Sequence, residues 1–377
     1  MPMSDWRRSD PLCCCEYVNS NDERSHILEC CCNCEVLDQT CERLITCRRI
    51  HRDQLSEIMN TILERFRVPW RGGAKQIACD SILPIFMQPL LAYIAIQNVW
   101  CTVLAVVILQ VLLWYVCCVY VKKNPQTRVF FVWILTSVTL LIMVFEVSVV
   151  PFMEIRPEEN VAFIVLVVCS LFCLYKVWSR SSLNHVIHNN SQEELLVNRS
   201  KVSENVCPTC RKRVPPRTYH CNICQTCVLK KEYHSTWLNC CIGEKNSSLF
   251  VLGIFLSFLS LIYGAVLTLT TVCHPVYIME IFLLPDDCSD VYHNVEMAVC
   301  FVSAVYSLLL ATVLLVLVIH HSWLISLGLT GQEWQELQGV DGRCCGMYAD
   351  RPYNKGVLKN WQDMEYLQFL QGSLVLH

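Results

Sequence analysis

The chain has 377 residues, of which 54% are hydrophobic, and its formal net charge at pH 7 is -3. This composition is too apolar for an ordinary soluble protein and predicts several membrane spans. The small net charge argues against a nucleic-acid partner, which would favour a strongly basic chain.

The 27 cysteines include adjacent runs at 13–15 and 30–32. Adjacent cysteines suit a disulfide framework poorly, which leaves metal binding, thioester lipidation and reduced bystander thiols as interpretations. All three interpretations favour a cytosolic face.

The predicted fold is an α-helical multi-pass membrane protein with six transmembrane helices, since apolar runs of about 20 residues cross a bilayer. The polar start of the chain predicts no signal peptide. The predicted regions are a Cys-rich N-terminal region (1–80), helices 1 to 4 (81–178), a polar loop (179–248), helices 5 and 6 (249–319) and a C-terminal tail (320–377). Helices 1 and 2 share the run 82–121, with a turn near Gln97 and Asn98, and the others are predicted at 129–150, 161–178, 249–272 and 295–319.

Loop charge predicts the orientation of these helices. The loop after the second span carries Lys122, Lys123 and Arg128 and no acid, whereas the loop after the fifth, 280–290, carries acids and no Lys or Arg. Because cytosolic loops carry the excess of Lys and Arg, the long loop 179–248 and both termini are predicted to be cytosolic. The acidic loops would then face the lumen or exterior.

A repeated pattern of three cysteines and one histidine, C-x2-C-x9-H-x6-C, occurs twice in the long loop, with an offset of 14 residues. Each set offers four N/S ligands, which suits closed, tetrahedral structural zinc. The first set is Cys207, Cys210, His220 and Cys227, and the second is Cys221, Cys224, His234 and Cys241. We therefore predict two interleaved structural zinc ions, which would leave His234 unavailable as a base and Cys240 as a spare thiol.

The segment 207–250, which includes "PPRTYHC" and "CIG", resembles the cysteine-rich domain of the DHHC protein S-acyltransferases, or palmitoyltransferases. "LTGQE" (329–333) is similar to the family's Thr-Thr-x-Glu motif with Gly331 in place of the second Thr, and "RPYNKGVLKNW" (351–361) is similar to its C-terminal segment, with Asn360 in the expected place. The resemblance implies a membrane-helix bundle with a cytosolic zinc-knotted domain between helices 4 and 5. It also implies an ER or Golgi membrane.

The resemblance further implies a catalytic signature. In the family, the signature Cys takes an acyl group from acyl-CoA and passes it to a substrate cysteine, while the first His activates the thiol and an Asp orients that His. The corresponding positions here are Glu232, Tyr233 and Ser235. A phenol with a pKa near 10 is a poor base at neutral pH, and a serine hydroxyl is far less acidic than a thiol.

Whether the chain is an enzyme stays open between two hypotheses. One is an impaired palmitoyltransferase that uses palmitoyl-CoA as co-substrate, with Ser235 or Cys240 as the acyl acceptor. The alternative is a non-catalytic membrane scaffold or regulator that binds partner proteins, acyl-CoA or active relatives. A transporter is a third class, suggested by Glu146 within the third predicted span, which is either a functional carboxylate or a hydrated one near the lumenal end. Cys344 and Cys345, beside Arg343, are further candidates for lipidation.

Overall fold

The computed structural model describes residues 13–19, 23–29, 34–46, 58, 61–62, 64–71, 73–76, 82–121, 127–152, 155–186, 206–278, 282–341 and 351–363. The chain divides into two compact units, Met1–Phe86 with Thr127–Val129 and Met87–Gln126 with Phe130–His377, and each is described by itself. Four residues used in the sequence predictions lie outside the described residues: Cys344, Cys345, Lys122 and Lys123.

The described part of the first unit contains short strands, an amphipathic helix and further helical residues at 58, 61–62 and 64–65. Its elements are β1 (Glu16–Val18), β2 (Arg24–His26), α1 (Cys34–Ile45), β3 (Arg67–Val68) and β4 (Lys75–Gln76). The strands pair antiparallel as β1 with β2 and β3 with β4. Tyr17 is buried, and the guanidinium of Arg67 lies 3.9 Å from the centre of its ring. This cation–π contact ties the two small sheets together.

The second unit is dominated by long apolar helices. They are α3 (Ile82–Ala95), α4 (Val99–Tyr115) with the π-helix η2 (Val116–Tyr120), α6 (Val129–Val144) with the π-helix η3 (Phe145–Val149) and α7 (Val150–Phe152), α8 (Pro157–Arg180) with the 3-10 helix η4 (Ser181–Asn184), α10 (Ser247–Val272) and α11 (Val295–Leu327). Five of these stretches, Val99–Tyr120, Val129–Val149, Pro157–Asn184, Ser247–Val272 and Val295–Leu327, are long and apolar enough to cross a membrane. The multi-pass helical character of the prediction is thus supported.

The sixth span of the prediction is not confirmed. The predicted turn occurs at the expected place, where Asn98 accepts a hydrogen bond from the Cys101 backbone N–H and begins α4. The helix before the turn, α3, has 14 residues. At 1.5 Å per residue it reaches about 21 Å, which is short of the roughly 30 Å hydrocarbon core.

Two spans are longer than hydropathy predicted. The helix α8 begins at Pro157 rather than 161, because proline suits the first helical turn and Glu159 accepts from the Arg156 backbone N–H in a capping box. The helix α11 continues past the predicted end at 319 and stops at Gly328, whose φ of 70° forms a left-handed C-cap.

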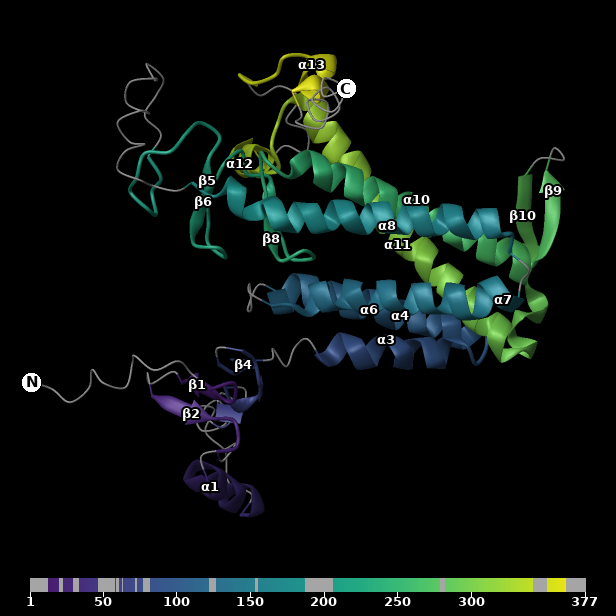
Figure 1. The fold of residues 1–377 in the computed structure, drawn as a ribbon, viewed down its shortest axis with the longest axis horizontal. Helices are drawn as coiled ribbons and strands as arrows, with labels where there is room; N and C mark the ends of the chain where they lie inside the picture. The colour runs from purple at the N-terminus through teal and green to yellow at the C-terminus, as the bar shows by residue number, and fades with distance from the viewer. Residues whose placement is uncertain are drawn as a thin grey trace, which may run out of the picture. The chain divides into compact units, whose positions relative to one another are not determined.

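The helices α8, α10 and α11 lie side by side, and α10 packs along both of the others (Figure 1). At one end of α10 the core is formed by Val177, Ile242 and Phe250. At the other end it is formed by residues such as Phe145 and Phe163, whose ring centres are 4.1 Å apart. Glu146 lies at this second end and accepts a hydrogen bond from Asn160 Nδ2.

Opposite ends of α10 carry different structures. The cysteine-rich hairpins precede its start, and the hairpin of β9 (His274–Ile278) and β10 (Phe282–Asp287) follows its end (Figure 1). A disulfide joins Cys273 to Cys288 across the base of this hairpin, just before the 3-10 helix η5 (Ser289–His293). This bond corrects the expectation that the cysteines serve only as metal ligands, lipid acceptors or reduced thiols. That expectation rested on the clustered cysteines, and these two are isolated in the sequence.

The C-terminal part folds back onto the end of α11. It contains α12 (Gly331–Asp341) and α13 (Val357–Gln362). The side chain of Asn360 donates to the Ser326 carbonyl at 3.0 Å and accepts from the Lys355 backbone N–H, while Trp361 Nε1 donates to Ser326 Oγ. Asn360 thereby fastens the tail to the last turn of the long helix.

Candidate functional site

The cysteine-rich loop folds into two hairpins that repeat each other. The first pairs β5 (Tyr219–Cys221) with β6 (Thr226–Val228), and the second pairs β7 (Tyr233–Ser235) with β8 (Cys240–Ile242). His220 stands opposite Cys227 in the first, and His234 stands opposite Cys241 in the second. Residues that are 14 positions apart in the sequence therefore occupy equivalent positions in the two hairpins, which have the same strand register.

The eight Cys and His side chains form two groups of four. The structure brings together Cys207, Cys210, His220 and Cys227, and separately Cys221, Cys224, His234 and Cys241, with all ligand atoms of a group within 4.8 Å of one another. In the second group, His234 Nδ1 lies 3.4 Å from Cys224 Sγ and 3.5 Å from Cys241 Sγ. Tetrahedral zinc with ordinary bond lengths has ligand separations of about 3.5–3.8 Å. Donor types and spacing therefore both fit a metal ion in each group.

The turn that begins at Ser235 has the geometry of the two C-x2-C turns, at 207–210 and 221–224, but it lacks metal ligands. Cys207 Sγ accepts from the Cys210 backbone N–H at 3.4 Å, and 28 residues later Ser235 Oγ accepts from the Leu238 N–H at 3.3 Å. Positive φ values follow the same spacing, at Arg211, Gln225 and Asn239. Ser235 thus occupies the first position of a third turn, and its hydroxyl takes the place of the turn-closing sulfur.

Buried asparagines hold the second hairpin against the membrane helices. Asn246 is completely buried, and its Nδ2 donates to the carbonyls of Val177 and Cys241, each at 3.0 Å. Its Oδ1 accepts from Asn184 Nδ2 and from the Gly243 backbone N–H, both at 2.9 Å. Every polar atom of this amide is used, so the position of β8 relative to α8 and α10 is fixed closely.

Glu232 connects the hairpin to the start of α12. It is 8% exposed, and its Oε2 accepts the Gly331 backbone N–H at 2.6 Å. Burial raises the pKa of Glu232 to about 7, although the Gly331 N–H opposes this. A Cβ at position 331 would lie 2.9 Å from the Glu232 carbonyl oxygen and 3.4 Å from Glu232 Oε2. The Glu232 carboxylate therefore reaches the residue 331 backbone because glycine leaves room for it there.

Arg217 forms a second connection to α12. Its Nε and Nη2 donate to the two carboxylate oxygens of Glu333 at 2.7 and 2.6 Å, and Nη2 also donates to the Gly328 carbonyl. The ring of Tyr353 lies against the guanidinium, 4.7 Å away. Glu333 also accepts from the Thr330 backbone N–H. Such bidentate pairs are strong and directional, so the hairpin region and the tail are firmly joined here.

Tyr233 lies against a histidine from a distant element. Its hydroxyl is 3.3 Å from Nε2 of His321 on α11, and the two rings stack with centres 5.6 Å apart. Phe250 packs edge-on against both rings. Burial, and then the charge of Glu232, raise the pKa of Tyr233 above its usual value. The phenol is therefore held protonated and cannot serve as a base at neutral pH.

Ser235 and Cys240, the two proposed acyl acceptors, stand directly opposite each other on β7 and β8. Ser235 is 2% exposed and Cys240 is 5% exposed. Burial raises the pKa of the Cys240 thiol to about 11. The Cys240 thiol is therefore held mainly in its protonated form, whereas the thiolate is the nucleophilic form of cysteine.

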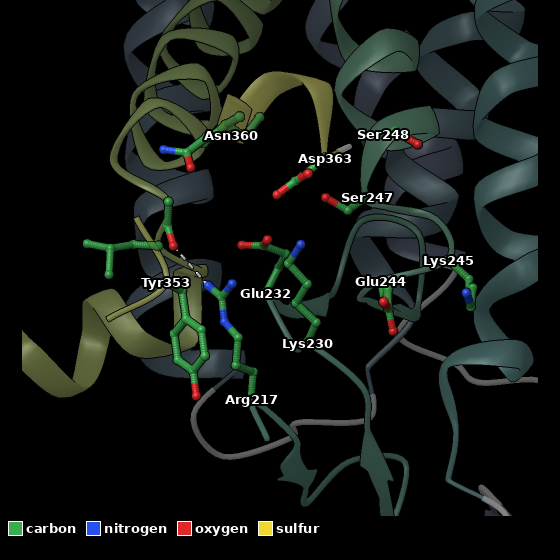
Figure 2. A pocket seen from close by; sticks show the side chains of 13 residues that line it. Arg217, Lys230, Glu232, Glu244, Lys245, Ser247, Ser248, Tyr353, Asn360 and Asp363 are labelled. Carbon is green, nitrogen blue, oxygen red and sulfur yellow. Dashed lines mark hydrogen bonds between the residues drawn. The ribbon is translucent and has the colours of Figure 1, made fainter. Parts of the chain in front are cut away.

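A polar cavity of about 230 Å³ adjoins Glu232. Figure 2 shows Glu232 and Lys230 near its centre, with Asp363 and Ser247 across from them and Arg217 beside Tyr353 at one edge. The lining also includes Glu244, Lys245, Ser248 and Asn360. Charges of both signs and several neutral hydrogen-bonding groups therefore meet beside the start of α10, which suits a polar, multiply charged ligand.

Sequence reasoning missed two partners in this site. Arg217 lies within the quoted "PPRTYHC" segment, but nothing in the local pattern identifies Glu333 as its partner, 116 residues away. His321 was missed because the sixth span was ended two residues before it. A histidine at the end of an apolar run is a signal that could have found it, since titratable groups in spans are functional candidates by default.

Several known proteins that are similar to this chain are named palmitoyltransferases. Residues 200–338 match the family described as DHHC palmitoyltransferase. Palmitoyltransferase ZDHHC23 from Rattus norvegicus is 30% identical over 423 residues, covering 98% of this chain and 95% of that protein. The protein of the same name from Mus musculus is 30% identical over 399 residues (93% and 92%), and that from Homo sapiens is 29% identical over 395 residues (90% and 94%).

Proposed function

Because the chain belongs to the DHHC palmitoyltransferase family, we propose that it keeps the membrane-bound scaffold of a palmitoyltransferase without forming an acyl-enzyme at residue 235. It would act as a zinc-containing membrane scaffold or regulator that binds acyl-CoA, protein partners or active relatives. The observation that carries this proposal is Ser235, which is buried and whose hydroxyl closes a turn with Leu238.

The other two positions of the implied catalytic signature support the same conclusion. Glu232 accepts the Gly331 N–H, and Tyr233 meets His321 rather than residue 235. Each side chain therefore has a packing role in the described structure. A general base must lie within hydrogen-bond reach of the proton that it removes. Among the described residues, the hydrogen-bond partner of Ser235 Oγ is the Leu238 backbone N–H, which is a donor and cannot act as a base.

We assign one structural zinc ion to each group of three cysteines and one histidine. Zinc would cross-link the loop, which has a small apolar core of its own around Cys221, Val228 and Cys241. Closed Cys₃His coordination leaves no position for an activated water. The metal would therefore contribute folding energy and no chemistry.

Membrane orientation follows from the same proposal. The zinc region, within 179–248, would face the cytosol together with 1–80 and the tail 320–377, which have the predicted reduced cysteines. The hairpin closed by Cys273 and Cys288 lies at the opposite end of α10, and a disulfide there suits an oxidising lumen. An ER or Golgi membrane, with α3 as a sixth membrane-embedded helix, agrees with this arrangement.

The polar cavity beside Glu232 would take the head of acyl-CoA. Lys230 and Lys245 could neutralise phosphate charge, while Ser247 and Ser248 offer hydroxyls at the start of α10. Binding there without transfer would make the protein a carrier or sensor of acyl-CoA rather than an enzyme.

The test is incubation of the purified full chain with labelled palmitoyl-CoA. We expect no covalent label on the unaltered protein, although it would retain the labelled acyl-CoA on a desalting column under native conditions. The quadruple change Glu232→Asp, Tyr233→His, Ser235→Cys and Gly331→Thr restores the family's residues, and it should produce a hydroxylamine-sensitive acyl-enzyme. Strong transfer to a substrate cysteine by the unaltered chain would overturn the proposal.

Residual transfer through Cys240 is a second candidate function, favoured by its place directly opposite Ser235. The thiol would attack the acyl-CoA carbonyl, and CoA would leave as its thiol. A hydroxylamine-sensitive label that disappears with Cys240→Ala but persists with Ser235→Ala would establish it. A label that survives Cys240→Ala would exclude it.

A further inference from the structure

A second cavity lies among the apolar helices, away from the zinc region. Its volume is about 340 Å³, and its lining comes from α3, α4, α6 and α11, with no residue of α8 or α10. Ligand sites are commonly concave, mostly apolar and about 300–1,000 Å³ in volume, with a few well-placed polar groups. This cavity has each of these properties.

Polar side chains gather at one end of the cavity. Gln88 Nε2 donates to the Trp133 carbonyl at 2.8 Å, and Gln88 Oε1 accepts from Ser137 Oγ at 3.1 Å. Tyr306 accepts from Trp133 Nε1 at 3.1 Å and shares a hydrogen bond of 2.7 Å with Ser137. Polar groups within an apolar helix bundle are energetically costly unless they are hydrogen-bonded. The cluster of Gln88, Trp133, Ser137 and Tyr306 is therefore a candidate functional site.

The cluster keeps hydrogen-bonding capacity for one more group. A glutamine amide has two donors and two acceptor lone pairs. The described contacts use one donor and one lone pair of Gln88, whose side chain lines the cavity. A ligand with a single hydroxyl could accept from the remaining N–H and donate to the remaining lone pair.

The remainder of the cavity is elongated and mostly apolar, and its other hydroxyl-bearing lining residues are Tyr93, Thr102 and Ser303. It extends along α6 from Trp133 to Val144, and along the antiparallel α11 from Leu309 to Val299. Eleven residues of helix correspond to about 16 Å. Among the described lining residues none is charged, so a fatty-acid carboxylate or a phosphate would find no counter-ion there.

We propose that this cavity binds a sterol. Its hydroxyl would bind at the Gln88 amide, and its rigid ring system would extend along α6 toward Val144. The polar cluster begins about one turn after the start of α6, so the bound hydroxyl would lie nearer to one end of that helix than to its middle. A phospholipid chain would leave the spare amide capacity of Gln88 unused in hydrocarbon, which is the physical reason to prefer a sterol.

The experiment uses the full chain in membranes with a photoreactive, alkyne-tagged cholesterol analogue. We expect labelled peptides from α4, α6 and α11 that line the cavity, and loss of label when excess cholesterol is added. Gln88→Leu should reduce labelling by at least about threefold to tenfold, the range for each hydrogen bond that is lost with the amide. Ala105→Phe, which fills the cavity, should reduce it to the level of the competed sample.

Val313→Phe is the matched control, because this α11 side chain is exposed and does not line the cavity. Zinc content and a single elution peak show whether each variant is folded. Labelling confined to surface positions, or unchanged by both Gln88→Leu and Ala105→Phe in folded protein, would overturn the proposal. Equal labelling by a photoreactive phosphatidylcholine that cholesterol does not displace would also overturn it, since the cavity would then hold ordinary bilayer chains.

Discussion

The two hairpins of the zinc region have the same register and nearly the same residues, yet they stand in different surroundings. The first reads Tyr-His-Cys at 219–221 and the second reads Tyr-His-Ser at 233–235. The hydroxyl of Tyr219 donates to Glu336 at an exposed contact, whereas Tyr233 is packed against His321 and Phe250. The repeat shows that zinc spacing builds the frame, and that the neighbouring helices decide what each copy of the frame does.

The largest expected effect comes from removing one ligand of the second Cys/His group, whose members come from both hairpins. Cys241→Ser should abolish folding of the second hairpin and halve the zinc content, since structural zinc supplies about 10–16 kcal/mol in small zinc domains. Metal analysis and limited proteolysis of the loop measure this. Cys240→Ser, the adjacent thiol outside both groups, is the control and should keep both zinc ions. Unchanged protease resistance in Cys241→Ser would contradict the assignment.

The next largest effect tests the ion pair of Arg217 with Glu333, which joins the first hairpin region to the C-terminal tail. Arg217→Ala should destabilise the protein by about 3 kcal/mol, because it leaves the largely buried Glu333 carboxylate without its partner. Arg217→Lys should recover only part of this, since it loses the bidentate geometry. Thermal unfolding in detergent is the measurement, with the exposed Arg211→Ala as control. Equal melting of Arg217→Ala and Arg211→Ala would show that the pair is unimportant.

A smaller effect tests the fit between the second hairpin and α12. Gly331→Thr should cost about 1–3 kcal/mol, because its Cβ would press on the Glu232 backbone. Adding Glu232→Asp should restore part of the loss by shortening the facing side chain. Gln335→Thr, an exposed position in the same helix, controls for helix propensity. If the double variant melts below Gly331→Thr alone, the two residues are not matched in size.

The smallest expected effect is the difference in stability loss between Tyr233→Phe and Tyr219→Phe. Tyr233→Phe should cost about 1 kcal/mol, the net value of one buried hydrogen bond. Tyr219→Phe should stay within about 0.5 kcal/mol of the unaltered chain because its contact is exposed. Parallel melting curves of the two variants provide the measurement. A larger loss for Tyr219→Phe would reverse the assigned difference in environment.

Local spacing made much of this arrangement predictable. The offset of 14 residues was enough to pair the ligands into two sets, because a C-x2-C turn is closed within a few residues. Apolar length was enough to find five long spans, although caps such as Arg156 with Glu159 moved their ends. The sixth span, at α3, stays unconfirmed because hydropathy records an apolar run and not the helix length within it.

The sequence by itself determined the zinc frame, the apolar helices and the identity of residues 232, 233 and 235, because these depend on composition and short spacing. Only the tertiary structure decided that Tyr233 meets His321, that Arg217 pairs with Glu333, and that Ser137 joins Gln88 and Tyr306. Such contacts join residues 49 to 169 positions apart. These contacts arise from how the helices pack, which no local sequence pattern encodes. They determine whether the two Cys/His hairpins take part in chemistry, in binding or in structure alone.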